Sequence, residues 1–239
     1  MKNPTICFLV SLCMVYTGLC QEPEIILNDL LVSNAYKTCE RIDSIYYFVG
    51  HNGDYDQEIW RTNGTPEGTY RVANVHLGGS AWPGELTRVD DKLFFMATDD
   101  NGSEQLYLSD GTEEGTQWVF DVDPEAKEQY HMLTASGGLL YFRTTRPQIF
   151  TVLWVSDGTT ENTHMVADIC DNMISYPHEL TDFNGTLIFI AEDCAMGGET
   201  LYSTKGINGT VSQVGGYLVR ALMTTNAHLY FVSTSEDYG

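Results

Sequence analysis

The sequence predicts an all-β protein, specifically a β-propeller of about five four-stranded blades. Two observations lead to this prediction. A turn with a central glycine recurs in steps of 47, 47 and 48 residues, at Gly64, Gly111, Gly158 and Gly206. An apolar segment recurs in steps of 47 residues, around Phe48, Phe95, Phe142 and Phe189. A fixed period of this size is typical of repeat proteins, and propeller blades have units of about this length.

Each repeat divides into four short strands separated by turns. In the second repeat we expect strands at residues 86–89, 92–97, 105–109 and 117–122. The second of these contains Leu93-Phe94-Phe95-Met96-Ala97, which is apolar without alternation and therefore predicts burial on both faces, as in stacked sheets. Asp90-Asp91 before it suits a tight hairpin. An open β-solenoid or tandem hairpins are the alternatives, but β-helix coils are much shorter than 47 residues.

The repeats are expected at approximately residues 39–85, 86–132, 133–179 and 180–221, followed by a partial repeat at 222–239. Residues 24–31 precede the first repeat, where the last strand of a blade would stand. Either this N-terminal strand closes a fifth blade, or the last blade is incomplete because the chain is a piece of a longer propeller. We favour closure, because an open ring exposes strand edges that promote aggregation.

The N-terminus is typical of a secretory signal peptide. Lys2 provides a positive charge, and residues 6–16 form an apolar stretch that is too short to span a bilayer. A cut before Gln21 would leave a propeller domain at residues 21–239 that is secreted and does not span the membrane. The alternative of a bacterial lipoprotein site at Cys20 fits poorly, because Leu19 is larger than such a site usually accepts.

The chain carries 33 acidic and 12 basic residues, a formal net charge of −21. Nucleic acid is therefore an unsuitable partner, because its phosphates require clustered Lys and Arg. Divalent cations and basic surfaces are electrostatically favoured instead, although such a charge also keeps a secreted protein soluble.

The repeated turn is carried by Leu106 to Thr116 and by Leu153-Trp154-Val155-Ser156-Asp157-Gly158-Thr159. This pattern resembles the ELW-x-x-DGT tandem-repeat family of secreted and surface proteins over about residues 39–232. Asn63 and Lys205 depart from it, because both stand where the pattern has Asp. The resemblance implies an extracellular, propeller-like protein and supplies no catalytic residues.

Acidic side chains gather in the loops between the second and third strands, where carboxylate oxygens are the ligands that calcium prefers. The candidate calcium ligands are Asp54, Asp56, Glu58, Asp99 and Asp100. Asp110 and Asp157 are a second candidate set. For these two we favour a role in the turn itself, because Lys205 stands at the equivalent place in the fourth repeat and would repel a cation.

Three cysteines remain after removal of the signal peptide, which predicts one disulfide and one spare thiol. We expect a bond between Cys170 and Cys194, with Cys39 as an alternative partner or as a link to another chain. The candidate N-glycosylation sites all lie in predicted turns, at Asn63, Asn101, Asn184 and Asn208.

No Ser/His/Asp arrangement, zinc-binding spacing or phosphate-binding loop is present in the sequence. The sequence therefore favours a non-enzymatic acidic protein of the extracellular matrix, which binds a protein, a glycan or a mineral surface and has calcium as its candidate ion. A lectin is the first alternative, and a propeller hydrolase is the second. Aromatic residues at blade period, such as Trp60 and Trp154, are expected to pack between blades rather than to bind sugar.

Overall fold

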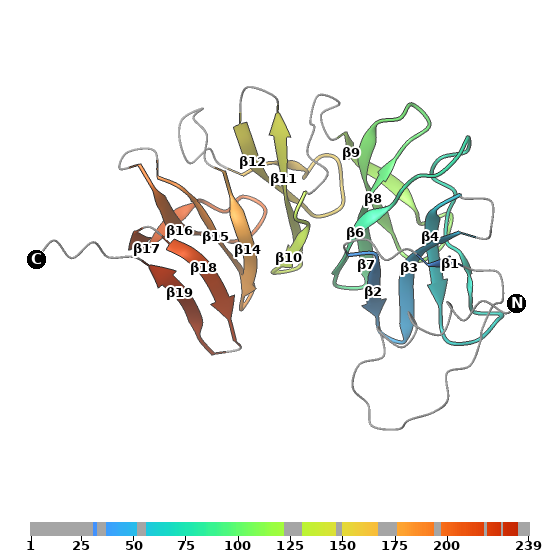
Figure 1. Ribbon diagram of the computed structural model, residues 1–239, viewed down its shortest axis with the longest axis horizontal. Coiled ribbons are helices and arrows are strands. Elements are labelled where there is room, and N and C mark those ends of the chain that lie inside the picture. The colour runs from blue at the N-terminus through green and yellow to red at the C-terminus, as the bar shows by residue number, and fades with distance from the viewer. Residues whose placement is uncertain are drawn as a thin grey trace, which may run out of the picture. The chain divides into compact units, whose positions relative to one another are not determined.

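A computed structural model describes residues 31–32, 37–51, 56–121, 131–146, 150–166, 176–193, 197–217, 219–225 and 227–233 (Figure 1). Every regular element in these ranges is a β-strand, so the predicted all-β class is confirmed. The chain forms two compact units, Met1–Trp118 and Val119–Gly239. Each unit is described separately below. The signal peptide predicted at residues 1–20 lies outside the described residues.

The first unit contains two antiparallel sheets. The first sheet has the order β1-β3-β4-β5, with β2 also paired to β3. Its strands are β1 (Leu31–Val32), β2 (Cys39–Ile42), β3 (Ile45–His51), β4 (Glu58–Thr62) and β5 (Tyr70–Arg71). The second sheet has the order β6-β7-β8-β9, and β9 continues into the second unit. Its strands are β6 (Gly84–Val89), β7 (Lys92–Thr98), β8 (Glu104–Ser109) and β9 (Gln117–Asp121). These bounds agree with the predicted strands to within two residues.

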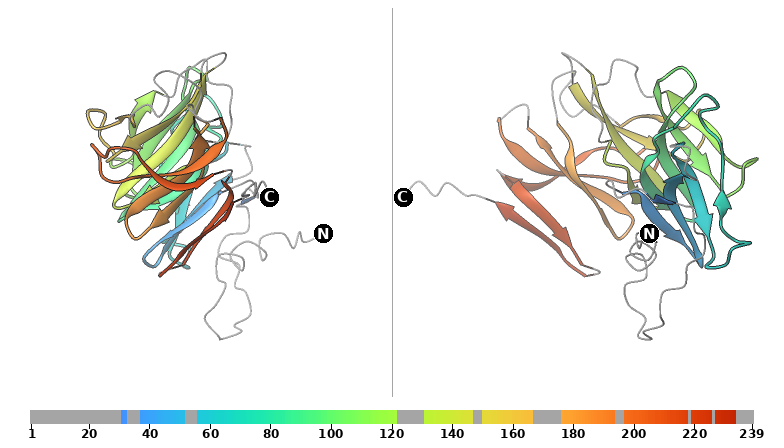
Figure 2. Two further views of the ribbon diagram at one scale, coloured as in Figure 1. Left: turned by 90° about the vertical axis from the view of Figure 1, so that its left-hand side faces the viewer. Right: turned by 45° about the vertical axis from the view of Figure 1, so that its right-hand side comes forward.

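The second unit contains two further four-stranded sheets and a hairpin. One sheet has the order β10 (Thr134–Ser136), β11 (Leu139–Arg146), β12 (Phe150–Ser156), β13 (His164–Met165). The next has the order β14 (His178–Phe183), β15 (Thr186–Glu192), β16 (Glu199–Thr204), β17 (Ser212–Tyr217). The hairpin consists of β18 (Val219–Thr224) and β19 (Leu229–Ser233). Figure 2 shows this hairpin as a ribbon separate from the β14–β17 sheet. Four-stranded antiparallel blades repeated along the chain confirm the predicted propeller fold class.

Closure of the last blade by residues 24–31, the favoured alternative, stays a prediction. Leu31 and Val32, where that segment ends, pair with His51 and Gly50 of β3. The reason is that β2 pairs only as far as Phe48, so the end of β3 has a free edge that β1 occupies. The fifth sheet consists of β18 and β19 in the described residues and is therefore incomplete there. Residues 24–30 lie outside the described part.

The recurring phenylalanines occupy equivalent positions, as predicted. Each lies in the second strand of its sheet, opposite an aromatic residue of the third strand. The pairs are Phe48 with Trp60, Phe95 with Tyr107, Phe142 with Trp154 and Phe189 with Tyr202. The rings of the last three pairs are stacked, with centroids 5.6, 6.1 and 5.9 Å apart. These stacked pairs lie within one sheet. Packing between blades, the predicted role, is confirmed for Tyr107 and Tyr202, because each packs in a cluster with residues of the preceding sheet.

The structure contains a repeated backbone conformation that the sequence did not predict. Glu85, Met132 and Glu179 follow one another at intervals of 47 residues, and all have positive φ, between 51° and 53°. The threonine two residues later donates its hydroxyl to the carbonyl of each, as Thr87 does to Glu85 at 2.9 Å. Non-glycine residues rarely adopt this conformation, so the hydrogen bond and the local irregularity of the first strand offset a real strain.

Candidate functional site

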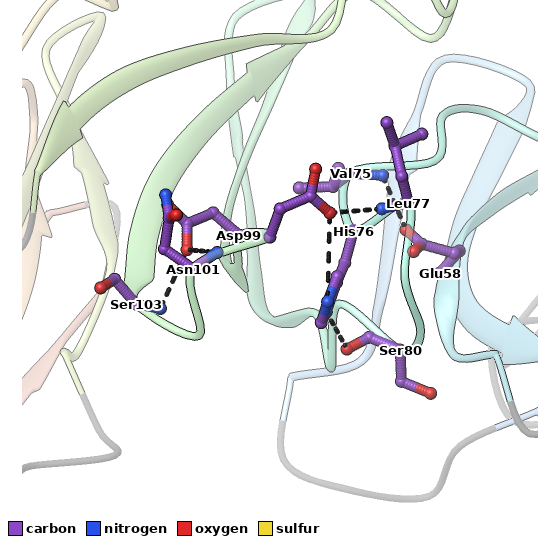
Figure 3. A network of polar contacts seen from close by, with 9 residues as sticks. Glu58, Val75, His76, Leu77, Ser80, Asp99, Asn101 and Ser103 are labelled. Carbon is purple, nitrogen blue, oxygen red and sulfur yellow. Dashed lines mark hydrogen bonds and ion pairs between the residues drawn. The ribbon is translucent and has the colours of Figure 1, made fainter.

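Three segments of the first unit meet at one end of its two sheets, where β4 and β8 begin. We call this region the acidic rim, and it comprises residues 56–58, 74–82 and 98–103 (Figure 3). The central segment is tied to both sheets. The Ala81 N–H donates to the Gln57 carbonyl at 3.1 Å, and the Thr98 N–H donates to the Ala81 carbonyl at 2.7 Å. The loops that follow the second and fourth strands thus lie together, as expected for a propeller.

Glu58 lies at the start of β4 and is completely buried. Its Oε2 accepts the Val75 N–H at 3.4 Å, and the Asn74 amide, oriented so that both its O and N are satisfied, donates to Oε1 at 3.2 Å. Burial raises the pKa of Glu58 to about 7, and the nearby Asp56 carboxylate adds to the rise, while the N–H groups of Val75 and His76 oppose it. Glu58 therefore holds a proton over much of the acidic pH range.

Asp56, two residues before Glu58 and just before β4, is the neighbouring carboxylate. Its Oδ2 lies 3.0 Å from Nη1 of Arg71, with which it forms an ion pair. Its Oδ1 is buried and has no hydrogen-bond partner among the described residues. Part of the negative charge at this end of the first sheet is thus neutralised within the protein.

Asp99 and Asp100 lie in the loop between β7 and β8. Asp99 Oδ1 accepts the N–H groups of Asn101 and Ser103, both at 2.9 Å, and these bonds, Ser103 first, lower the pKa of Asp99. Asp100 Oδ1 accepts the Leu77 N–H at 2.6 Å and lies 4.0 Å from Nε2 of His76 (Figure 3). Asp99 therefore holds its own loop in shape, while Asp100 joins that loop to the central segment.

The candidate calcium ligands are only partly brought together. Asp54 lies outside the described residues, and Asp56, Glu58, Asp99 and Asp100 all belong to the acidic rim. Each of these four makes separate contacts inside the protein. Within the described ranges, no group of three or more His, Cys, Asp or Glu side chains is arranged to hold a metal ion. Calcium binding by these residues stays a prediction.

The rim also presents two apolar side chains that the sequence analysis missed. Leu77 is 76% exposed and Trp82 is 63% exposed, the highest values among the large hydrophobic residues of the described part. They lie on the central segment, which is bonded to the Asp99–Asp100 loop on either side through Leu77 and Ala81. The Gly78-Gly79 pair and Pro83 around them were the available signal, since they mark an exposed turn rather than a packed strand.

Asp110 and Asp157 stabilise the Asp-Gly-Thr turn, which is the role that the sequence favoured for them. Asp110 Oδ1 accepts the N–H of Thr112 at 2.9 Å and its hydroxyl at 2.7 Å, and these bonds lower the pKa of Asp110, the hydroxyl first. Ser109 and Thr116 share a hydrogen bond of 2.8 Å across the base of the turn. The same bonds recur around Asn63 and Asp157. In the fourth repeat, where Lys205 and Ile207 replace the bonding residues, Thr204 Oγ1 is buried without a partner in the described residues.

Cys39 at the start of β2 is in a disulfide bond. Its partner lies outside the described residues, as do Cys170 and Cys194, so the predicted bond between those two stays a prediction. All four candidate glycosylation residues are exposed, namely Asn63, Asn101, Asn184 and Asn208. No helix in the described ranges is long and apolar enough to cross a membrane.

No protein-family model and no curated protein matches the chain. Among solved structures, the chain is similar to one from a study of two prolyl endopeptidases, with a TM-score of 0.57, 11% identity and coverage of 91% of this chain. A puromycin hydrolase mutant gives a TM-score of 0.47 with 14% identity over 77% of this chain. The chain spans about a third of the length of each, 33% and 32%.

A third similar structure is an endo-arabinase from Bacteroides thetaiotaomicron, with a TM-score of 0.32, 10% identity and coverage of 85% of this chain and 95% of the other. At these sequence identities, the first similarity supports a shared fold only. The other two have TM-scores below 0.5 and support no conclusion. The comparisons therefore give no support to the predicted absence of enzymatic activity. That absence, and the resemblance to the ELW-x-x-DGT family, stay predictions.

Proposed function

We propose that the chain is an extracellular binding protein of the matrix type, and that its acidic rim binds a basic segment of a protein partner. The observation that carries this proposal is the position of Leu77 and Trp82, two highly exposed apolar side chains beside the Asp99–Asp100 loop. An indole face attracts a Lys or Arg side chain, and a neighbouring carboxylate pairs with its charge. The net charge of −21 favours the approach of such a partner.

The central segment is suited to this role because it is held before any partner arrives. The hydrogen bonds of Leu77 to Asp100, of Ala81 to Gln57, and of Thr98 to Ala81 fix both ends of the segment. The His76 ring also bonds to the Ser80 carbonyl at 3.1 Å and closes the loop on itself. A pre-organised surface loses less conformational entropy on binding. The disulfide of Cys39 supports an oxidising, extracellular location.

Binding of an arginine-rich peptide to the full chain tests the proposal. We expect Trp82→Ala and Asp100→Asn each to weaken binding by about tenfold, the effect of about 1.4 kcal/mol. Tyr70→Ala is the matched control, because Tyr70 is an exposed aromatic residue at the opposite end of the first sheet. Equal binding by Trp82→Ala and the unchanged protein would refute the proposal.

A lectin is the second candidate, favoured by the same exposed indole, because sugar rings stack on tryptophan while carboxylates bind their hydroxyl groups. A glycan array with the full chain and Trp82→Ala separates the two candidates. Glycan binding that is lost in the variant, without peptide binding, would favour the lectin. Calcium is tested separately through the melting temperature, and an unchanged value across millimolar calcium would remove calcium from the proposal.

A further inference from the structure

Trp82 has an equivalent in the second unit that the proposed function does not use. Tyr176 follows it by 94 residues, twice the 47-residue period, and both residues stand two positions before the first strand of a sheet. Tyr176 is 45% exposed, and each of the two aromatic residues is followed by a buried proline. Residues 35–36 and 129–130, at the same place in the period, contain no proline, so the aromatic-proline pair occurs once in each unit.

The backbone of the two segments is also the same. The φ angle is 47° at Trp82 and 41° at Tyr176. Bulky residues rarely adopt these values, and a residue before proline prefers an extended backbone. Both first strands then shift register, within residues 84–87 and within residues 178–181. Strain of this kind concentrates at functional sites, and because both rings are exposed, the burial of the rings does not explain it.

Tyr176 also has a carboxylate close to it. Nε2 of His178, two residues after Tyr176, lies 3.0 Å from Oε1 of Glu199 at the start of β16, and the Glu199 side chain is 42% exposed. One basic group lies nearby, because Nη1 of Arg143 donates to the Pro177 carbonyl at 3.4 Å, so part of its charge is taken up by the backbone. An exposed ring near an accessible carboxylate is the combination already described for the acidic rim.

We propose that Tyr176 is the centre of a second binding site for the same kind of ligand, so that one chain binds two basic segments. The inference rests on the proposed function of the acidic rim. The ring face of Tyr176 attracts a Lys or Arg side chain, and Glu199 pairs with its charge. Tyrosine attracts a cation less strongly than tryptophan does, so this site is the weaker of the two. A chain with two such sites can join two partner molecules, which suits a matrix protein.

The stoichiometry of binding tests the inference. The probe is an Arg-Gly repeat peptide, titrated into the full chain in physiological salt, which screens the general attraction of a chain with a net charge of −21. We expect calorimetry to show two peptides bound to each chain, one of them more weakly.

Variants assign the two sites. Trp82→Ala should leave only the weaker site and Tyr176→Ala only the stronger one, because each change weakens its own site by about tenfold. Tyr176→Phe should keep both sites, since the ring face is retained. Glu199→Gln should weaken the second site alone, while its amide oxygen still serves as a partner for His178.

Tyr70→Ala is the matched control and should leave two sites, because Tyr70 is a tyrosine of similar exposure, 41%, in strand β5. One peptide for each chain, lost in Trp82→Ala and kept in Tyr176→Ala, would overturn the second site and leave the proposed function of the rim intact. Two sites of unchanged affinity in Tyr176→Ala would also overturn it. No binding to the unchanged protein would refute the proposed function, and this inference with it.

Discussion

The buried Glu58 should make the stability of the protein fall as pH rises from acid to neutral. Burial raises its pKa from 4.5 to about 7 in the folded state, whereas the unfolded chain keeps the ordinary value. The folded state therefore binds this proton more tightly. Below pH 4.5 the carboxyl is neutral in both states and costs nothing, and through the range 4.5 to 7 the folded state pays progressively for ionising a buried group.

The size of the effect follows from the shift. A shift of this size corresponds to about 3 kcal/mol when complete, at about 1.4 kcal/mol for each pKa unit. Between about pH 5 and about pH 8 the unchanged protein should lose about 2–3 kcal/mol of unfolding free energy through this group. Glu58→Gln has no such titration, although its amide also loses one of the two hydrogen bonds that Glu58 accepts from Asn74 and Val75.

The assay is urea unfolding of both proteins at the two pH values. The informative quantity is the change with pH of the difference between them, because a lost hydrogen bond contributes equally at both and the other titrating groups are shared. Asp100→Asn is the matched control, since Asp100 is an exposed carboxylate of the same rim. If Glu58→Gln and the unchanged protein lose stability in parallel, or if Asp100→Asn removes the same pH dependence, the reasoning about burial is wrong.

Three further predictions concern the repeat. Phe95→Ala should cost about 3–5 kcal/mol in unfolding free energy because Phe95 is fully buried, whereas Phe231→Ala should cost under about 1 kcal/mol because Phe231 is 45% exposed, and comparable losses would contradict this difference in burial. Asp110→Ala should lower stability by about 1–2 kcal/mol through the lost turn bonds, and Asp110→Asn should retain most of it, as Asn63 does; chemical denaturation decides. Gly137→Ala should destabilise more than Gly102→Ala in thermal melts, because both have positive φ but the added Cβ at Gly137 would lie 2.7 Å from the Gly185 carbonyl oxygen.

The fold was predictable because its signals are local and repeated. Asp43, Asp90, Gly137 and Asn184 start the turns before each second strand, and all four adopt positive φ there, which Asx and Gly tolerate best. Strands in which apolar residues do not alternate with polar ones, such as Leu93 to Ala97, predicted burial on both faces, and the structure confirms it. Because the pattern occurs four times, an irregularity in one copy does not obscure the predicted positions of the strands and turns.

The site was less predictable, because it depends on contacts between segments far apart in the chain. The carboxylates of the rim were found from their clustering, yet the burial of Glu58 depends on residues 74–77, which follow it by a whole strand and turn. Trp82 was missed because its exposure is set by the Ala81 bridge between Gln57 and Thr98. The positive φ of Glu85, Met132 and Glu179 has no compositional signal, since two of the three are glutamates and one is methionine.

Most hydrogen bonds of the Asp-Gly-Thr turn close within eight consecutive residues, from Ser109 to Thr116, and the exception is the Gly111 carbonyl, which accepts from Nη1 of Arg61 at 3.3 Å. Because these bonds are local, the turn can form in each copy of the repeat with little dependence on the rest of the chain. One copy can also depart from the pattern alone, as the turn at Lys205 does, while the turns at Asn63, Asp110 and Asp157 keep their bonds. A repeat added in tandem therefore brings a turn that can form by itself. The loops at the opposite end of each repeat can then vary without loss of this turn.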